Sequence, residues 1–348
     1  MKALLLSEYK QFEIAELARP EPKAGEVLIQ VAACGICGSD VHGYDGSSGR
    51  RIPPIVMGHE AAGRVAALGA GVTGLAAGER VTFDSTIYCG ECPYCARGEV
   101  NLCDRRQVMG VSCADYRCAG AFAEYVIVPA RIVFRLPDNL SFVEAAMLEA
   151  VAVALHAVAL SRVTPGDTAL VLGSGMIGLL TLQALRVAGC SRVLVADVDG
   201  SRLRLAREVG ASETLELSGA ELLAEVMRLT DHGGVDVAVE AVGIDPTVRS
   251  AIECTRKGGT VSLIGNVTAE VTLLLQKVVT RQLRLQGCCA SAGEYPEAIR
   301  LVAGGAIAVK PLITAIAPLE DGPQWFERLY RKEPNLMKVV LTPGPLAP

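Results

Sequence analysis

Aromatic residues are scarce in this chain of 348 residues, which contains 6 Phe, 8 Tyr and 1 Trp. Aromatic packing therefore cannot supply most of its core. Glycine is abundant, with 36 residues, and suits close packing of helices on a sheet. The chain is longer than the ~250–300 residues at which single cores stop growing, so we expect two domains and a large buried core.

Basic runs, internal repeats and low-complexity segments are also absent. The net charge is −5, with 33 Lys and Arg against 38 Asp and Glu. Neutralising nucleic-acid phosphates requires clustered Lys and Arg. We therefore exclude nucleic acid as the main partner and expect a small-molecule substrate.

No segment has the pattern of a membrane anchor or a secretion signal. Residues 168–185 carry no charge, but they include three glycines and change from a strand pattern to a helical one. The apolar run at the N-terminus is short and ends at Glu8. We expect a cytoplasmic protein without a membrane segment.

Cysteine is used unevenly along the chain. Cys89, Cys92, Cys95 and Cys103 have the spacing C-x2-C-x2-C-x7-C, and disulfides are rare in a reducing compartment. Thiolates at this spacing can converge on one tetrahedral zinc ion at ~2.3 Å and leave no position open for substrate. The spacing predicts a structural zinc lobe over residues 89–103, with an iron–sulfur cluster or metal-free thiols as the alternatives.

A second set of metal-ligand types lies upstream, in a chain with only four histidines. The segment CGICGSDVH covers residues 34–42, and His59 and Glu60 follow in GHE. One thiolate, one imidazole and one carboxylate would bind zinc and leave its fourth position open, as catalytic zinc requires. Glu149, in an otherwise apolar segment, is either solvated at a helix end or drawn inward by a cation.

A glycine-rich turn predicts a dinucleotide site. A short apolar strand at residues 168–172 precedes GSGMIG, in which Gly173, Gly175 and Gly178 fit G-x-G-x-x-G with Met176 and Ile177 between them. In this motif the backbone approaches a pyrophosphate at the start of a helix.

The next predicted strand, residues 192–196, ends at Asp197. A carboxylate at this position can accept hydrogen bonds from the adenosine ribose and repel a 2′-phosphate, so we expect NAD in preference to NADP. Arg202 could weaken that preference, or it could lie on the solvated side of the following helix.

Further strands are expected at residues 236–240 and 260–265. Alternating strands and helices predict a parallel, doubly wound sheet with ligands at the carboxyl ends of the strands. Val242, Gly243, Gly265 and Asn266 follow these strands and are candidate cofactor contacts or turn residues.

Four motifs in this order, GICGSDVHGY, GHEAAGRV, the four-cysteine lobe and VLGSGMIG, resemble the zinc-dependent medium-chain dehydrogenases. The resemblance covers about residues 2–342. Glu149 replaces the second ligand cysteine of typical alcohol dehydrogenases, which is similar to the sorbitol, threonine and sugar-alcohol branch. The resemblance implies an α/β chain with a GroES-like, β-rich catalytic domain at 1–150 and 290–348 and a Rossmann domain at 151–289.

Residue by residue, the resemblance implies that Cys37, His59 and Glu60 bind the catalytic zinc. Glu149 would be a fourth ligand or would bond to zinc-bound water, and it could exchange with Glu60 during turnover. Asp40 would hold the ligand histidine from behind.

Three more residues receive roles from the resemblance. Ser39 and His42 would pass the substrate proton through the cofactor ribose to water, and Lys338 would reach the cofactor phosphates or lie solvated at a strand end.

The resemblance implies two zinc ions per subunit and hydride transfer between NAD and the secondary alcohol of a polyol or sugar alcohol, with or without a phosphate. Sorbitol dehydrogenases carry an aromatic residue, an arginine and a tyrosine after the glycine equivalent to Gly287, whereas this chain has Cys288, Cys289 and Ala290. That difference argues against sorbitol itself. Threonine or 2,3-butanediol dehydrogenation and a non-catalytic zinc- and nucleotide-binding protein are the alternatives. Relatives of this kind form homodimers or homotetramers.

Overall fold

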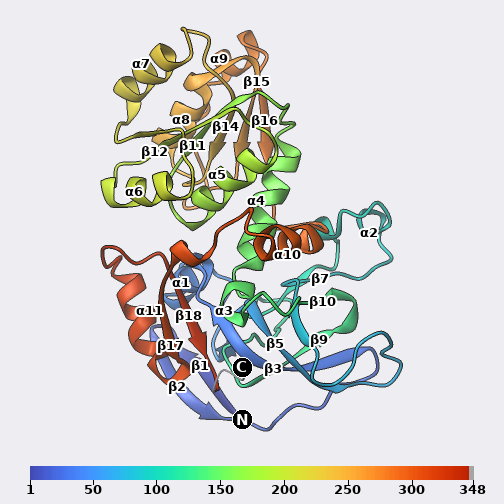
Figure 1. Ribbon diagram of the computed structural model, residues 1–348. Coiled ribbons are helices and arrows are strands. Elements are labelled where there is room, and N and C mark those ends of the chain that lie inside the picture. The colour runs from blue at the N-terminus through green and yellow to red at the C-terminus, as the bar shows by residue number, and fades with distance from the viewer. Residues whose placement is uncertain (345–348) are drawn as a thin grey trace. The chain divides into compact units, whose positions relative to one another are not determined.

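The computed structural model describes residues 1–344, which form two compact units (Figure 1). Unit 1 contains Met1–Glu149, Tyr295–Ala303 and, within the described residues, 312–344. Unit 2 contains Ala150–Glu294 and Gly304–Pro311. The division at residue 149 lies close to the expected boundary, but the chain returns to unit 1 at Tyr295, and a short later segment belongs to unit 2.

Unit 1 is built mainly from antiparallel strands. Their bounds are β1 Lys2–Glu8, β2 Gln11–Glu16, β3 Glu26–Gly35, β4 Ile55–Val56, β5 Glu60–Leu68, β6 Arg80–Phe83, β7 Thr86–Ile87, β8 Gln107–Val108, β9 Tyr125–Pro129, β10 Val133–Arg135, β17 Ile313–Pro318 and β18 Lys338–Thr342. The largest sheet has the order β10-β6-β5-β3-β18-β17, with β9 also paired to β3. Two smaller sheets, β2-β1-β4 and β7-β8, complete the unit.

Strand β3 is central to this unit because it pairs with β5, β9 and β18. Its sequence, EVLIQVAACG, is rich in aliphatic residues, and most of them are buried, as in a strand covered on both faces. The strand ends at Gly35, which lies opposite Glu60 in the register with β5. This pairing brings the segment after β3 next to the first residues of β5.

Short helices occupy the edges of unit 1. Their bounds are α1 Gly38–Tyr44, α2 Pro93–Ala96, α3 Phe142–Ala145, α10 Tyr295–Ala303 and α11 Gly322–Tyr330, with 3-10 turns at Val100–Leu102, Ala130–Ile132 and Leu319–Asp321. Helices α1 and α11 pack together. Aromatic rings of Phe12, Tyr44 and Phe326 meet there within 6 Å, centroid to centroid.

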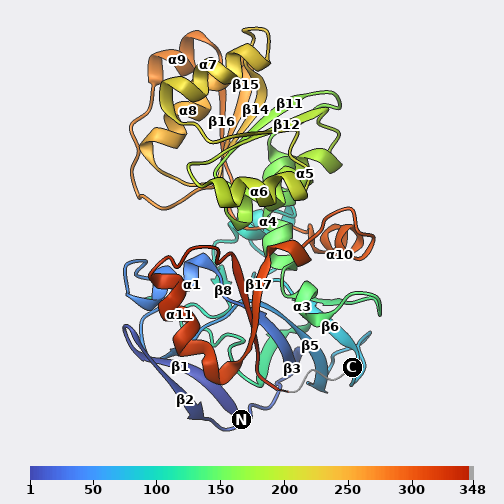
Figure 2. The ribbon, with the colours of Figure 1, turned by 60° about the vertical axis from the view of Figure 1, so that its left-hand side comes forward.

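Unit 2 has one parallel sheet with the order β13-β12-β11-β14-β15-β16, which confirms the doubly wound α/β prediction. The strands are β11 Thr168–Leu172, β12 Arg192–Ala196, β13 Glu213–Leu215, β14 Val235–Glu240, β15 Thr255–Leu263 and β16 Arg284–Gly287. The helices are α4 Leu148–Leu160, α5 Met176–Val187, α6 Gly200–Glu208, α7 Gly219–Leu229, α8 Asp245–Cys254 and α9 Leu275–Thr280, with a 3-10 turn at Lys310–Leu312. Helices α5 and α6 cover one face of the sheet, and α7 and α8 cover the other (Figure 2).

Strand β15 differs from its prediction at both ends. It begins at Thr255, five residues before the predicted start, and its pairing with β14 shifts register after Val235. The extension contains Gly258 with a positive φ of 72°, and this Lys-Gly-Gly stretch has the composition of a turn. The irregular first half of β15 was therefore not predicted, because its residues are typical of a turn.

The uncharged stretch at residues 168–185 forms strand β11 and most of helix α5. Across residues 1–344, no helix is both long enough and apolar enough to cross a membrane.

Candidate metal centres and cofactor site

Helix α1 begins with a capping arrangement that fixes the first candidate ligand. Cys37 occupies the N-cap position, and its backbone N–H donates to Oδ2 of Asp40 at 3.2 Å. An acidic residue three positions after an N-cap commonly satisfies the N-cap N–H in this way. The C-x-x-D spacing therefore ties the backbone of Cys37 to the buried carboxylate of Asp40.

His59 and Glu60 reach the same place from the start of strand β5. Gly58 turns the chain with a φ of 95°, and a side chain there would collide with Cys34 and Phe122. One ligand atom from each of Cys37, His59 and Glu60 lies within 4.8 Å of the other two. The structure therefore brings together the three residues that the resemblance named as first ligands.

The carboxylate of Asp40 stands behind His59. Its Oδ1 lies 3.4 Å from Nδ1 of His59 and accepts a hydrogen bond from Nη2 of Arg51 at 3.0 Å, and all three side chains are buried. Burial would raise the pKa of Asp40, but His59 and then Arg51 hold it well below its usual range. Because Nδ1 faces Asp40, the other ring nitrogen of His59 is left for a metal.

The electrostatics of this cluster favour a cation. Burial would lower the pKa of His59, yet Asp40 and Cys37 raise it well above its usual value. The same groups that stabilise a positive charge on His59 would also stabilise a divalent metal ion at this site. Together with a sulfur, nitrogen and oxygen donor set, it fits zinc with one coordination position open.

Glu149 lies near this cluster but outside the group of three. Its Oε1 accepts a hydrogen bond from Oγ of Ser85 at 3.2 Å. Burial raises its pKa, whereas the positive charges of His59 and Lys338 act in the opposite direction. The inward-facing alternative for Glu149 therefore agrees with its surroundings.

Lys338 occupies a different place from the predicted one. Its Nζ donates to Oε2 of Glu60 at 2.5 Å and to the carbonyl oxygen of Ile36 at 3.1 Å, and its side chain is 3% exposed. Burial would lower its pKa, but Glu60 and Cys37 raise it, so the ammonium stays charged. The burial of Lys338 contradicts the solvated alternative, and its ammonium contacts Glu60 in this structure, whereas the contact with the cofactor phosphates stays a prediction.

Ser39 and His42 lie on helix α1, next to this cluster in the chain, and both are exposed. Residues three apart share one face of a helix. The hydroxyl of Ser39 accepts from Nη2 of Arg51 at 3.4 Å. The helix thus presents the two predicted proton-relay residues on the same side.

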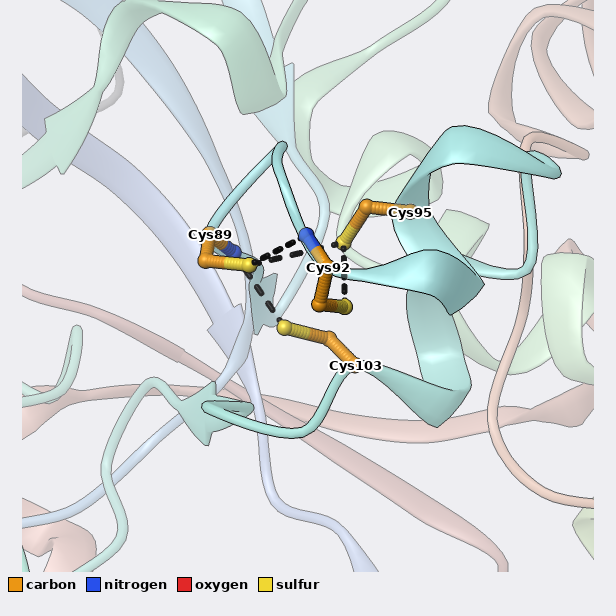
Figure 3. Close-up of side chains that lie close together, drawn as sticks. All are labelled: Cys89, Cys92, Cys95 and Cys103. Atoms are coloured by element: carbon orange, nitrogen blue, oxygen red, sulfur yellow. Dashed lines mark hydrogen bonds between the residues drawn. The ribbon is translucent and has the colours of Figure 1, made fainter.

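The four cysteines of the lobe converge around the short helix α2 (Figure 3). Their sulfur atoms lie within 4.8 Å of one another, with Cys95 at 3.5 Å from Cys92 and 3.9 Å from Cys89. A tetrahedral zinc with sulfurs at ~2.3 Å has sulfur–sulfur edges of about 3.8 Å. Four sulfurs at this spacing fit a closed structural zinc site.

Backbone N–H groups in the lobe donate hydrogen bonds that stabilise the thiolate form of a cysteine. The N–H groups of Glu91 and Cys92 donate to Sγ of Cys89 at 3.5 and 3.3 Å, and they lower its pKa to about 6. Burial and the neighbouring thiols raise the pKa of Cys95 to about 12. The lobe therefore stabilises some thiolates by itself and needs a cation to stabilise all four.

The predicted dinucleotide turn joins β11 to α5. Gly173 has a φ of 95°, and a side chain at Gly178 would collide with the carbonyl oxygen of Gly173. Gly175 caps α5 with open space around it, and Met176 and Ile177 begin the helix. The glycines therefore serve the tight turn, the open approach to the helix start and close helix packing, as a pyrophosphate site requires.

Asp197 follows β12 and faces this turn. Its Oδ2 accepts from the backbone N–H of Ser174 at 2.6 Å and from the Ser174 hydroxyl at 2.7 Å, and its Oδ1 accepts from the N–H of Asp199 at 3.0 Å. A carboxylate has about four acceptor positions, so one remains for a ribose hydroxyl. Arg202 pairs with Asp199 at 3.5 Å and stays on α6.

The loops after β14 and β15 touch each other. A side chain at Gly243 would collide with the backbone of Gly265 and Asn266, and Val242 lies against Gly173. Glu240 is fully buried, and its Oε1 accepts from the N–H groups of Val242 and Gly243 at 2.9 and 2.8 Å. These loops border the point where the strand order reverses between β11 and β14, which is where open α/β sheets bind ligands.

Comparisons with known proteins identify the family to which the chain belongs. Residues 23–138 match the alcohol dehydrogenase GroES-like domain, and residues 177–304 match the zinc-binding dehydrogenase model. Sorbitol dehydrogenase of Bacillus subtilis (strain 168) is 33% identical over 99% of this chain and 98% of its own. The chain belongs to the zinc-dependent medium-chain dehydrogenases.

Solved structures of similar dehydrogenases cover nearly the whole chain. A zinc-binding dehydrogenase from Sinorhizobium meliloti 1021, bound to NADP, is 35% identical over 98% of this chain and 99% of its own, with a TM-score of 0.90. Galactitol-1-phosphate dehydrogenase from Escherichia coli is 28% identical over 99% of this chain and 100% of its own, also with a TM-score of 0.90. This medium-chain dehydrogenase is therefore an α/β enzyme of the alcohol and polyol dehydrogenase type.

Four residues near the two sites went unnoticed in the sequence of this medium-chain dehydrogenase: Arg51, Ser85, Glu240 and, in its actual position, Lys338. Glu240 alone gave a signal, because it ends a run of otherwise mostly apolar strand residues. The others reach the sites from neighbouring strands and loops through tertiary packing, so their spacing along the chain carries no pattern.

Proposed function

We propose that this protein is an NAD-linked dehydrogenase that interconverts a secondary alcohol of a polyol or sugar alcohol and the corresponding ketone. The observation that carries the proposal is the convergence of Cys37, His59 and Glu60, with Asp40 behind the imidazole. These donors leave a coordination position open, and a substrate hydroxyl can occupy it. A second zinc, held by the four cysteines of the lobe, has a structural role.

When bound by Cys37, His59 and Glu60, zinc would serve as a Lewis acid for the substrate hydroxyl, and a bound nicotinamide cofactor would serve as the hydride acceptor. Ser39 would accept the proton that leaves the hydroxyl and release its own proton to the cofactor ribose. His42, three residues further along helix α1, would take a proton from the ribose and pass it to water. Glu149, partly buried near the donor group, would be able to exchange with Glu60 as a ligand.

The substrate class rests on two arguments. The similar dehydrogenases include one for sorbitol and one for galactitol 1-phosphate, both polyols. Cys288 and Cys289 replace the polyol-facing residues that the resemblance would place after Gly287, so a polyol other than sorbitol is favoured. A phosphorylated sugar alcohol, a cyclitol or a vicinal diol has the required secondary hydroxyl.

Asp197 supports NAD in preference to NADP, because a carboxylate beside the ribose repels a 2′-phosphate. One similar dehydrogenase binds NADP, so the two cofactors must be compared directly. In Asp197→Asn we expect the ratio of kcat/KM with NAD to that with NADP to fall by about 10-fold, a change of ~1.4 kcal/mol. An unchanged ratio would show that Asp197 does not determine the preference between NAD and NADP.

We further propose a cytoplasmic homodimer or homotetramer. Unit 2 carries several exposed aliphatic side chains between β15 and the edge strand β16: Val267, Val271, Leu273, Leu275 and Val279. Apolar surface of this kind beside an open strand suits pairing between two copies of the chain. Sedimentation analysis of the purified protein tests the assembly.

The decisive experiment records NADH formation with polyols, sugar alcohols and their phosphates, cyclitols, vicinal diols and threonine, each with and without prior chelation. We expect one class of secondary alcohol to reduce NAD and chelation to abolish the reaction. Reduction of NAD by threonine or 2,3-butanediol alone would replace the polyol proposal. No turnover with either cofactor, in protein that contains zinc, would favour a non-catalytic zinc- and nucleotide-binding role.

A further inference from the structure

The ammonium of Lys338 lies inside the candidate catalytic centre. It contacts Oε2 of Glu60 at 2.5 Å while the same carboxylate belongs to the group of three ligand atoms. The side chains of Lys338 and Glu60 are 3% and 1% exposed, so water does not screen their interaction.

The backbone fixes this contact. Lys338 begins strand β18, which pairs with the end of β3, and its Nζ also donates to the carbonyl oxygen of Ile36. Gly35 lies opposite Glu60, and a side chain at Gly35 would occupy the space of the Glu60 carboxylate. The glycine therefore lets Glu60 fold toward the lysine.

Charge balance gives this lysine a reason to be present. Cys37, Glu60 and Glu149 offer three anionic groups, one more than a single zinc ion neutralises. Asp40 already pairs with Arg51. A buried excess of negative charge is costly, and Lys338 supplies the balancing positive charge.

We propose that Lys338 is a positioning residue that weakens Glu60 as a zinc ligand, so that an incoming alcohol displaces Glu60 easily. A carboxylate that is bonded to an ammonium donates less electron density to a second cation. Glu60 then alternates between the metal and Lys338, and Lys338 sets the balance. This inference rests on the catalytic zinc site proposed above.

The test uses protein with cobalt(II) in the catalytic site and zinc left in the cysteine lobe, titrated with the best alcohol substrate in the presence of NADH. The visible cobalt spectrum reports the exchange of Glu60 for the alcohol. In Lys338→Met we expect about 10-fold more alcohol to be needed for half conversion, with KM raised accordingly, the size typical of groups that hold metal ligands. Lys338→Gln keeps a donor for Ile36 without the charge, and we expect the same shift.

The pair Glu60→Gln and Glu60→Gln/Lys338→Met isolates the route of the effect. Without a carboxylate at position 60, removal of Lys338 should change the alcohol titration by less than about twofold. Lys2→Met is the matched control, because it removes an exposed lysine from its pair with Glu320 and should leave the spectrum unchanged.

If the wild type and both Lys338 variants gave the same alcohol titration, the role of Lys338 would be contradicted, while the proposed catalytic centre would stand. A shift that persists in the Glu60→Gln background would also overturn it, because the lysine would then act on the metal without the carboxylate. A wild-type protein that takes up no cobalt outside the lobe would instead contradict the proposed catalytic centre, and the inference would fail with it.

Discussion

At the scale of single residues, the candidate catalytic centre depends on buried charged groups that contact one another. Asp40 is shared between Arg51 and His59, and its second oxygen accepts a hydrogen bond from the backbone N–H of Cys37, the N-cap of helix α1. One carboxylate therefore orients a candidate ligand, pairs a buried guanidinium and fixes the backbone of another candidate ligand. A change at any of these partners should affect both stability and metal binding.

The variant Arg51→Met should show that the buried Arg51–Asp40 pair contributes more to stability and to metal binding than an exposed ion pair does. Loss of the guanidinium leaves the buried carboxylate without its arginine partner and beside the imidazole of His59, so we expect a loss of about 3–5 kcal/mol in the free energy of unfolding. Zinc affinity at Cys37, His59 and Glu60 should fall about 10–100-fold. Urea unfolding and chelator competition measure the two effects.

The control is Arg300→Met, which breaks an exposed pair with Glu297. Exposed pairs of this kind contribute little to stability, so this variant should unfold almost like the wild type. Equal behaviour of the two variants would mean that Arg51 does not support the metal site.

At the scale of elements, the cysteine lobe and the β11–α5 turn each depend on local geometry. The lobe contains only the four-residue helix α2, a 3-10 turn and bends at Gly90 and Gly98, so it has few apolar contacts of its own. A metal is then the main source of its stability.

Cys103→Ser should remove one zinc equivalent per chain and leave the other in place. We expect earlier thermal unfolding and faster proteolysis within residues 89–103, because the remaining thiols cannot complete a tetrahedral site. Metal analysis and limited proteolysis measure these outcomes. Cys118→Ser changes a cysteine outside the set and should retain both metals; the loss of zinc from Cys118→Ser as well would contradict the assignment.

Gly178→Ala and Gly175→Ala form a matched pair in the dinucleotide turn. The added methyl at position 178 meets the carbonyl oxygen of Gly173, so we expect a loss of about 1–3 kcal/mol in stability and weaker NAD binding. The methyl at position 175 meets no atom within 4 Å, and Gly175 has a φ of −71°, so stability should be retained. Calorimetric titration with NAD and urea unfolding compare the pair; a stable Gly178→Ala variant would show that close helix packing is not needed there.

At the scale of the whole molecule, the stability of unit 2 should depend on pH through Glu294. Burial would raise its pKa, but the hydrogen bonds from His156 at 2.7 Å and from the N–H of Ala292 hold it below the usual value. A group with a lowered pKa stabilises the fold above its unfolded pKa of about 4.3, and the stabilisation is lost as the pH falls through the folded value.

Glu294→Gln should therefore destabilise the protein at pH 7 by about 1.5–3 kcal/mol, the usual contribution of a hydrogen bond to a charged group. The difference from the wild type should shrink as the pH falls below about 4. Urea unfolding between about pH 3.5 and pH 7 measures it. A difference that stays constant over this range would assign the effect to packing instead of charge.

Much of this architecture could be predicted from the sequence because its signals are local. The strands at 168–172 and 192–196 were predicted at their observed bounds, since apolar runs between turn residues are short-range patterns. The C-x2-C-x2-C-x7-C spacing likewise brings four sulfurs together within one loop. The prediction that residues distant in sequence, such as Cys37 and His59, bind one metal came from the resemblance.

The sequence by itself determined the parallel sheet, the glycine turn and the spacing of the four cysteines, because each depends on neighbouring residues or on a recognisable motif. Only the tertiary structure decided where the chain returns to unit 1 and which charges share the candidate catalytic centre. Lys338 meets Glu60, and Arg51 meets Asp40, because strands and loops distant in the sequence pack side by side in unit 1. Such contacts leave no periodic signal in the chain, since burial and strand register fix the partner of a buried charge.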